Sequence, residues 1–194
     1  MNIKYLQAIV FDLDGTLVDS RLDFDKMRSD LGFPPGVPIL EHLSLQKDEN
    51  YKKECHKIIF EHEERGVDVA TLMPGVPKLL QAIKSKGLKT GLLTRNNSHV
   101  TKLTLEKFKL SFDMVFSRED CKPKPHPEGL LLMAKSWKVK TENMLYIGDF
   151  QFDLETAKNA NAKSCLYLNS YNHGLKAKAD YVLESYEALI RNLS

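Results

Sequence analysis

The sequence has few of the features that mark secreted, zinc-clustered or membrane-embedded proteins. Its three cysteines, Cys55, Cys121 and Cys165, are odd in number and far apart, so they fit neither a disulfide framework nor a zinc cluster. We interpret them as ordinary thiols of a reducing compartment. No apolar run approaches the roughly 20 residues of a membrane-spanning helix, and residues 1–14 carry acids where a signal peptide needs an apolar stretch. We therefore expect a cytoplasmic protein.

Neither basic nor acidic residues are in marked excess. The 28 basic and 26 acidic residues leave a formal charge of +2 over 194 residues, which argues against a dedicated nucleic-acid binder. Hydrophobic residues make up 42% of the chain, enough to build a core, so wholesale disorder is excluded. The length predicts one domain, or one domain with a small insertion.

Apolar strand patterns alternate with helical patterns over most of the chain. Six short apolar runs predict strands: 8–14, 88–94, 112–117, 143–149, 163–169 and 180–185. From residue 74 onward, the predicted helices are 74–87, 96–108, 128–137, 153–161 and 185–193. This alternation predicts an α/β fold, a Rossmann-like parallel sheet with helices on both faces. Ligands of such sheets bind at the carboxyl ends of the strands.

Residues 19–73 interrupt this alternation with helical patterns alone. The predicted helices there are 23–32, 38–44 and 46–65. Gly66 is expected to end the last helix, and no strand is predicted between Leu17 and Met73. The sequence therefore predicts a small all-α insertion over 19–73 in an α/β core formed by 1–18 and 74–194.

The first predicted strand ends in two carboxylates and a glycine. Asp12 and Asp14 are two residues apart, so along a strand they share a face. Gly15 lets a ligand approach the backbone closely and frees nearby amides to bind an anion. A calcium loop also opens with D-x-D, but its glycine stands sixth and a helix precedes it. A solvated acidic turn is the other alternative.

Further polar residues follow the later predicted strands: Thr94, Lys122, Lys124, Asp149 and Asp153. The threonine precedes a helix whose free amides would favour an anion, and the lysines lie in a loop stiffened by prolines. Each has an ordinary explanation when taken alone, as a helix cap, a solvated lysine or an acid in the first turn of a helix. Because strand ends of a parallel sheet meet at one edge, we expect these groups to converge.

Taken in order, these motifs resemble the haloacid dehalogenase superfamily, and specifically its phosphoglycolate phosphatase-like branch with a small helical cap. The segments that carry the resemblance are FDLDGTLVDS (11–20), MPGVPKLLQAIKSKGLKTGLLT (73–94), KPHPEGLL (124–131) and GDFQFDLETA (148–157). The resemblance extends over essentially the whole chain. The resemblance implies a Mg²⁺-dependent phosphatase that hydrolyses a small phosphorylated metabolite through an aspartyl-phosphate intermediate.

The resemblance also implies a role for each matching residue. Asp12 matches the nucleophile, Asp14 the general acid–base and Thr94 the phosphate-binding hydroxyl. Lys124 matches the motif lysine better than Lys122 does. The implied magnesium ligands are Asp12, Asp14 through its carbonyl oxygen, Asp149 and, as a supporting acid, Asp153.

Elementary electrostatics agrees with these roles. A phosphate monoester is doubly charged, so a divalent cation and a lysine must offset its repulsion of a carboxylate nucleophile. With an ordinary pKa of about 3.9, Asp12 would be ionised at pH 7 without a base. Asp14 must instead hold a proton near neutrality, which takes roughly 4 kcal/mol of differential interaction.

The substrate is less well defined. Candidate phosphate- or substrate-binding residues are Gly15, Arg95, Asn96, Arg28 and Arg21. Arg95, Phe150 and Phe152 depart from the family pattern, in which smaller or polar side chains are commoner, and therefore bear on the shape of the pocket. Two alternatives to a phosphatase are a phosphosugar mutase of the same superfamily and a non-catalytic module that binds phosphate and Mg²⁺.

Overall fold

A computed structural model describes residues 5–193 of the chain. These residues form two compact units. The larger unit runs to Asp19 and resumes at Thr71, and the smaller unit is Ser20–Ala70. Each unit has a hydrophobic core of its own.

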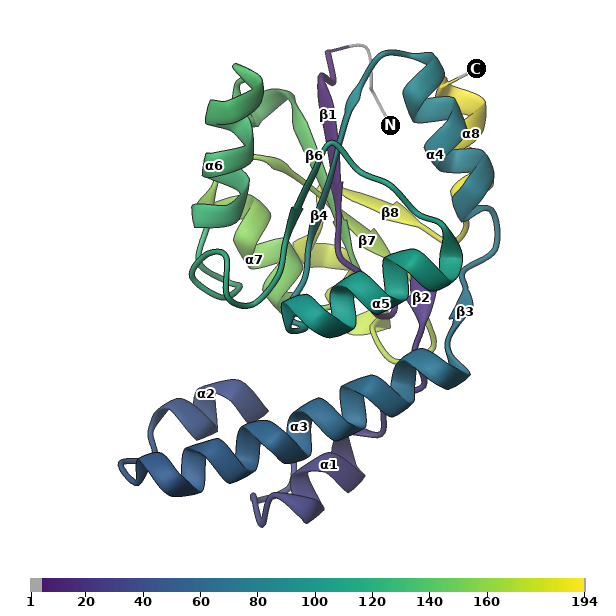
Figure 1. The fold of residues 1–194 in the computed structure, drawn as a ribbon. Helices are drawn as coiled ribbons and strands as arrows, with labels where there is room; N and C mark the ends of the chain where they lie inside the picture. Colours follow the sequence, from purple (N-terminus) through teal and green to yellow (C-terminus); the bar gives the residue numbers. More distant parts are fainter. Residues whose placement is uncertain (1–4, 194) are drawn as a thin grey trace. The chain divides into compact units, whose positions relative to one another are not determined.

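The larger unit is built on a six-stranded sheet (Figure 1). Its strands are β1 (Ala8–Phe11), β4 (Lys89–Leu93), β5 (Met114–Phe116), β6 (Met144–Gly148), β7 (Lys163–Tyr167) and β8 (Tyr181–Leu183). They lie in the order β5-β4-β1-β6-β7-β8, and every neighbouring pair is parallel. The central strands β1 and β6 are buried along their whole length, because helices cover both faces.

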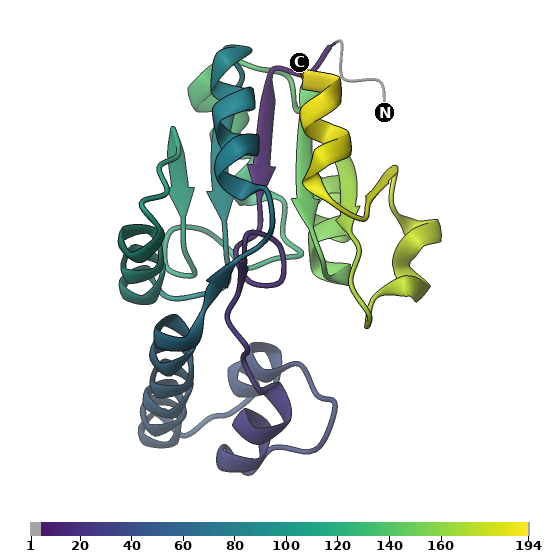
Figure 2. The same ribbon diagram turned by 90° about the vertical axis from the view of Figure 1, so that its right-hand side faces the viewer.

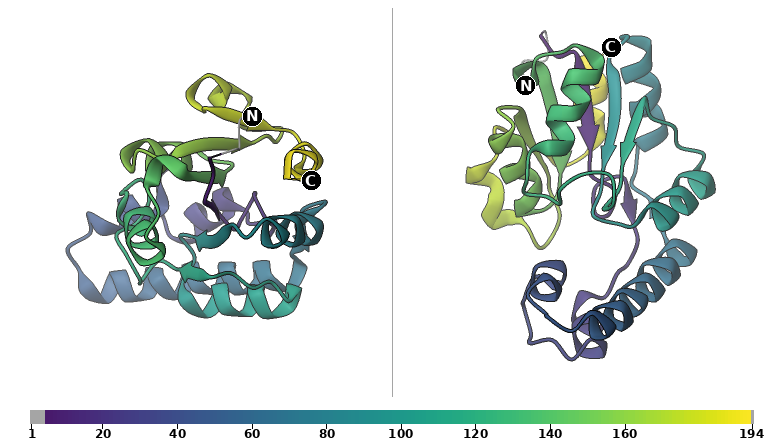
Figure 3. Two further views of the ribbon diagram at one scale, coloured as in Figure 1. Left: turned by 90° about the horizontal axis from the view of Figure 1, so that it is seen from above. Right: turned by 60° about the vertical axis from the view of Figure 1, so that its left-hand side comes forward.

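The helices of this unit are α4 (Val76–Ser85), α5 (Ser98–Phe108), α6 (Glu128–Trp137), α7 (Gln151–Asn159) and α8 (Tyr186–Leu193). Helices α6 and α7 cover one face of the sheet, while α4 and α8 lie together on the other (Figure 2 and Figure 3). Side chains alternate accordingly along β1, since Val10 joins the cluster beneath α6 and α7 whereas Phe11 contacts Tyr186 of α8. The predicted Rossmann-like α/β fold is confirmed.

Two short strands fall where the sequence predicted none. Strand β2 (Val18–Asp19) pairs antiparallel with β3 (Thr71–Leu72), at the two points where the chain leaves and re-enters the larger unit. The prediction of no strand between Leu17 and Met73 is therefore wrong. A two-residue strand has no periodicity to detect, and its partner lies about fifty residues away in the sequence. Two 3₁₀ helices, Thr141–Asn143 and His173–Lys178, were also not predicted.

The smaller unit consists of α1 (Phe24–Asp30), α2 (Ile39–Ser44) and α3 (Glu49–Val69). Its core residues are Met27, Leu31, Phe33, Leu43, Cys55 and Ile59. Asp23 and Asp48 cap α1 and α3 by accepting hydrogen bonds from backbone amides of the first turn. All three helices expected from the sequence are present.

Helix α3 does not end at Gly66, as the sequence predicted, but continues to Val69. Gly66 is buried, and a Cβ added there would lie 3.0 Å from Leu22 Cδ2 and 3.3 Å from the Ser20 carbonyl oxygen. The glycine therefore permits close packing of the helix against the segment that precedes α1. None of the helices in the described part of the chain has the length and hydrophobicity needed to cross a bilayer.

Candidate active site

Four adjacent strands bring their carboxyl ends to one edge of the sheet. Asp12 follows β1, Thr94 follows β4 and Asp149 follows β6, while Lys124 lies in the loop between β5 and α6. Strand β1 ends at Phe11, three residues earlier than predicted, so both carboxylates of the first motif lie beyond the strand. The expected convergence at this edge can therefore be tested contact by contact.

Lys124 joins two buried carboxylates. Its Nζ lies 2.6 Å from Asp12 Oδ1 and 2.6 Å from Asp153 Oδ1. The lysine is 4% exposed, and the two aspartates are 8% and 2% exposed. Lys122, in contrast, is exposed, and its backbone amide donates to Glu128 Oε2. The choice of Lys124 over Lys122 thus agrees with the position of its ammonium group.

Burial changes the protonation of this cluster. Burial raises the pKa of Asp12 to about 7. The opposing charge of Lys124 lowers this pKa less than burial raises it, and the nearby Asp153 and Asp14 raise it further. The expectation of an ordinary pKa for Asp12 is therefore wrong for the protein without a cation. Burial by itself would lower the pKa of Lys124, but its two carboxylate partners raise that pKa above the ordinary value. The lysine is thus held in its charged form.

Asp153 is held by donors on both of its oxygens. Besides Lys124, the hydroxyl of Tyr146 lies 3.1 Å from Oδ1, and the backbone amide of Phe150 donates to Oδ2 at 3.0 Å. Tyr146 is fully buried in β6, and its hydroxyl also lies 3.0 Å from the carbonyl oxygen of Leu93. Sequence analysis assigned Tyr146 no role, because a tyrosine in a buried strand is ordinarily a core residue.

Asp149 completes a group of three carboxylates. One oxygen each of Asp12, Asp149 and Asp153 lie within 4.8 Å of one another. Burial raises the pKa of Asp149 to about 8, and repulsion from Asp12 and Asp153 adds to this effect. Gly15 borders the same carboxylate, since a Cβ there would lie 2.2 Å from Asp149 Oδ2. This residue therefore has to be glycine for Asp149 to occupy its position.

This cluster suits a hard divalent cation. Three carboxylates and one ammonium group carry a formal charge of −2 when all are ionised, which one divalent cation would offset. All the candidate ligand atoms are oxygens, the kind that Mg²⁺ prefers. Of the predicted metal ligands, the structure groups Asp12, Asp149 and Asp153, but not the carboxylate of Asp14.

Asp14 is engaged by a different neighbour. The side-chain amide of Asn96 donates to Asp14 Oδ2 at 2.6 Å, and the backbone amide of Asn96 donates to Thr94 Oγ1 at 3.1 Å. Thr94 and Asn96 are 4% and 8% exposed. The sequence placed Asn96 among the phosphate- or substrate-binding residues, whereas its amide contacts the predicted acid–base. Sequence patterns relate residues that are close in the chain, so they did not predict this contact between Asp14 and Asn96, which are 82 positions apart.

The three residues that depart from the family pattern, Arg95, Phe152 and Phe150, form a chain of contacts. The guanidinium carbon of Arg95 lies 4.8 Å from the ring centroid of Phe152, and that ring meets Phe150 edge to face at 5.3 Å. Arg95 follows β4 and the two phenylalanines follow β6, so the contact connects segments on either side of β1. The side chain of Phe150 is 56% exposed.

Arg21 and Arg28 belong to the helical unit. Arg28 pairs there with Asp25, its Nη2 lying 2.6 Å from Oδ1, and its Nη1 lies 3.5 Å from the Val37 carbonyl oxygen. Arg21 has a positive φ of 51° in the segment before α1. Their predicted role toward a substrate stays a prediction.

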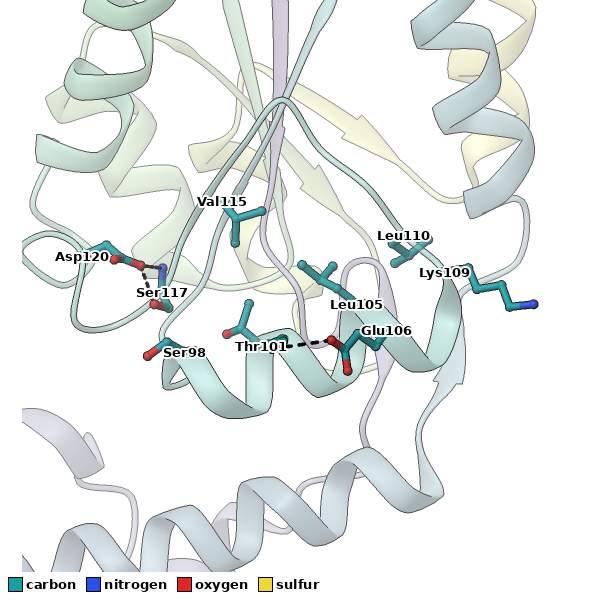
Figure 4. Close-up of a pocket in the computed structure, with 10 residues that line it drawn as sticks. Ser98, Thr101, Leu105, Glu106, Lys109, Leu110, Val115, Ser117 and Asp120 are labelled. Atoms are coloured by element: carbon teal, nitrogen blue, oxygen red, sulfur yellow. Dashed lines mark hydrogen bonds and ion pairs between the residues drawn. The ribbon is translucent and has the colours of Figure 1, made fainter.

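A separate cavity of about 380 Å³ lies between α5 and β5 (Figure 4). Leu105, Leu110 and Val115 supply apolar lining, and Ser117 and Asp120 lie at one end. None of the residues that line this cavity belongs to the carboxylate cluster. This cavity is therefore distinct from the carboxylate cluster.

Comparison with known proteins agrees with this site. A family model described as haloacid dehalogenase-like hydrolase matches residues 25–167, more than half of the chain. The match includes Lys124, Asp149 and Asp153, while Asp12 and Asp14 precede it. The chain belongs to the haloacid dehalogenase-like hydrolase family, and the resemblance inferred from the motifs is confirmed.

Individual relatives match a large share of the chain. A haloacid dehalogenase-like hydrolase domain-containing protein of Arabidopsis thaliana is 31% identical over 181 residues, covering 87% of this chain and 74% of the relative. A phosphoglycolate phosphatase of Aquifex aeolicus is 28% identical over 184 residues, covering 86% of each. The crystal structure of a hydrolase from Pseudomonas syringae superposes with a TM-score of 0.82 at 22% identity, over 96% of this chain and 97% of that one, and thus shares the fold.

Proposed function

We propose that this protein is a Mg²⁺-dependent phosphatase that hydrolyses a phosphoric monoester of a small metabolite. The observation that carries the proposal is the ion-paired group Asp12–Lys124–Asp153, with Asp149 beside it at the carboxyl ends of β1 and β6. Such a group has a carboxylate nucleophile, a buried cation and further oxygen ligands within one site. The name of the Aquifex aeolicus relative supports the same reaction class.

In the proposed reaction, Asp12 attacks phosphorus and the ester oxygen leaves. Asp14 donates its proton to this leaving oxygen, so an aspartyl-phosphate and the free alcohol result. Asp14 then accepts a proton from the water that attacks the aspartyl-phosphate, and inorganic phosphate is released with Asp12 restored. Asn96 holds Asp14 through the 2.6 Å hydrogen bond for both proton transfers.

Lys124 and Thr94 have supporting roles in this scheme. The ammonium group of Lys124 offsets the repulsion between Asp12 and the phosphoryl oxygens, and Asp153 holds the lysine in place. The hydroxyl of Thr94 binds phosphoryl oxygen. The free amides expected at the start of α5 do not join it, because the amides of Ser98 and Val100 already donate to Glu119 Oε2 and Asn97 Oδ1. Mg²⁺, when held by Asp12, the carbonyl oxygen of Asp14, Asp149 and Asp153, supplies positive charge that favours the ionised carboxylate and the developing charge on the phosphoryl group.

The substrate proposed is a small phosphorylated compound of the cytoplasm. Arg21 and Arg28 of the helical unit, together with Arg95, are candidates for binding a second anionic group on it. Replacing Arg28 by alanine should raise KM for a substrate with a second anionic group and leave unchanged the hydrolysis of an aryl phosphate whose aryl group is uncharged. Equal effects on both substrates would contradict this role.

A panel of phosphorylated metabolites tests the reaction class directly. With Mg²⁺ present, wild-type protein should release inorganic phosphate from at least one member, and Asp12→Asn should reduce that rate at least 1,000-fold, as roughly expected for loss of a nucleophile. Glu187→Gln, which changes an exposed acid of α8, is the control and should retain full activity. Phosphate release by Asp12→Asn, or an isomerised sugar phosphate as the main product, would contradict the proposal.

A further inference from the structure

The loop after β7 contacts Asp149 with two asparagine side chains. Strand β7 is the parallel neighbour of β6, so the segment after Tyr167 lies beside the segment after Gly148 at the same edge of the sheet. Asn169 Nδ2 donates to Asp149 Oδ2 at 3.0 Å, and Asn172 Nδ2 donates to the Asp149 carbonyl oxygen at 2.7 Å. One loop thus holds both the side chain and the backbone of Asp149.

Hydrogen bonds at both its nitrogen and its oxygen hold the side chain of Asn172 in place. Its amide also donates to the Tyr167 carbonyl oxygen at 2.9 Å, and its Oδ1 accepts from the Asn169 backbone amide at 2.9 Å. The residue is 6% exposed. A buried amide with donor and acceptor both used has one favourable orientation, so Asn172 ties the end of β6 to the end of β7.

The contact of Asn169 restricts the Asp149 carboxylate from one side, and Gly15 restricts it from another. A Cβ at Gly15 would lie 2.2–2.9 Å from the three atoms of that carboxyl group. Within the described part of the chain, no other side-chain donor reaches this carboxylate. Oδ1 therefore keeps its lone pairs for a further ligand.

The three carboxylates of the cluster accept hydrogen bonds from donors of different charge. Asp12 and Asp153 share the positive charge of Lys124, whereas Asp149 is held by neutral amides. A neutral donor orients a carboxylate without competing with a cation for its charge, and such partners of a metal ligand strongly affect metal affinity.

We propose that Asn169 and Asn172 are positioning residues that orient Asp149 for a divalent cation and thereby set the affinity of the site for Mg²⁺. This inference rests on the proposed function in one respect, namely that the carboxylate cluster binds a divalent cation. It adds that the loop after β7, which none of the sequence motifs includes, is part of the metal site.

Titration of Mg²⁺ into the full-length protein, followed by calorimetry in the absence of substrate, tests the inference. Asn169→Ala and Asn172→Ala should each raise the Kd for Mg²⁺ by about tenfold or more, because partners of this kind are typically worth 10- to 100-fold in metal affinity. Tyr171→Ala is the matched control in the same loop. Its side chain is 94% exposed, and its Kd should stay within about twofold of wild type.

Circular dichroism and urea unfolding show which variants fold. If Asn172→Ala, at the more buried position, does not fold, Asn169→Ala decides the matter, and Asn169→Gln, which keeps an amide donor, should recover part of the lost affinity. A Kd for Asn169→Ala within twofold of wild type would overturn the inference.

The two proposals fail in distinguishable ways. If the asparagine variants bind Mg²⁺ more weakly but the wild-type protein hydrolyses no phosphorylated compound, the proposed function alone is overturned. If the wild-type protein hydrolyses a phosphate ester but binds Mg²⁺ no more tightly than the asparagine variants do, the further inference alone is overturned.

Discussion

At the scale of single residues, the site depends on one lysine between two acids. Lys124 is nearly inaccessible to water, so its charge is stable only because Asp12 and Asp153 each lie 2.6 Å from it. Removing one member of such a buried group leaves the others without compensation. Function and stability are therefore coupled at this position.

Replacing Lys124 by alanine should abolish phosphatase activity and also lower the free energy of unfolding by about 3–5 kcal/mol at neutral pH. Urea unfolding followed by circular dichroism measures the second effect. Lys122→Ala is the matched control, because Lys122 is an exposed lysine of the same loop, and it should change stability by less than about 0.5 kcal/mol. Similar losses for the two variants would contradict a buried ion-paired role for Lys124.

Asn96 offers a second test, because sequence and structure give it different roles. If its amide positions Asp14, Asn96→Ala should lower kcat about 10- to 100-fold with little change in KM, since general acid–base catalysis contributes roughly 10²–10⁴-fold. Steady-state kinetics on the substrate found in the panel supply both constants. An increase in KM with kcat unchanged would instead assign Asn96 to phosphate binding.

At the scale of elements, both edge strands of the sheet are anchored by an aspartate. Asp113, before β5, accepts from the backbone amide and hydroxyl of Thr90, the second residue of β4. Asp180, before β8, does the same with Ser164, the second residue of β7. Each short edge strand is thus tied to its inner neighbour by side-chain hydrogen bonds in addition to its backbone ladder.

Asp113→Ala should lower the free energy of unfolding by about 1–3 kcal/mol at pH 7, because buried donors lose their acceptor. Burial acts to raise the pKa of Asp113, but hydrogen bonds from Thr90 and Lys89 outweigh it, and the pKa lies below its ordinary value. A lowered pKa stabilises the folded state above the ordinary pKa of aspartate, and this contribution is lost as the pH falls through the folded-state pKa.

The difference in stability between wild type and Asp113→Ala should therefore be largest near neutral pH and shrink as the pH falls below 3.8, the ordinary value. Urea unfolding at a series of pH values measures this difference. A difference that does not change with pH would show that the charge of Asp113 has no part in the effect.

At the scale of the whole molecule, several carboxylates and one lysine are concentrated where four strands end. Without a cation, the burial of the Asp12 and Asp149 carboxylates, together with their repulsion, opposes folding, and burial is the main cause of their raised pKa values. A cation that binds only the folded chain should therefore stabilise the whole protein.

Mg²⁺ at 100 times its Kd should stabilise the protein by about 2.7 kcal/mol, equivalent to a rise in Tm of roughly 5–10 °C. Thermal unfolding with Mg²⁺, and after chelation with EDTA, measures this shift. Asp149→Asn removes a ligand and part of the repulsion, so its Tm should respond little to Mg²⁺. An equal rise in Tm for the variant would place the cation elsewhere.

The sequence by itself was sufficient to predict the strands of the six-stranded sheet, the α-helices and the motif residues. Alternating apolar strands and helices specify a parallel sheet because each pattern buries one kind of surface. The rule that strand ends meet at one edge then predicted that Asp12, Asp149 and Lys124 would converge. The family resemblance added the role of each residue and is confirmed at the level of the family.

Only the tertiary structure decided the contacts between distant residues. Asn96 meets Asp14 across 82 positions, and Asn169 meets Asp149 because β7 lies beside β6. The pairing of β2 with β3 and the close approach at Gly66 likewise depend on packing between segments that are remote in sequence. The periodicity of apolar residues indicates which face of a helix or strand is buried. The exposed fraction of each side chain, its pKa and its hydrogen-bond partners depend on the segments that the fold packs against that face.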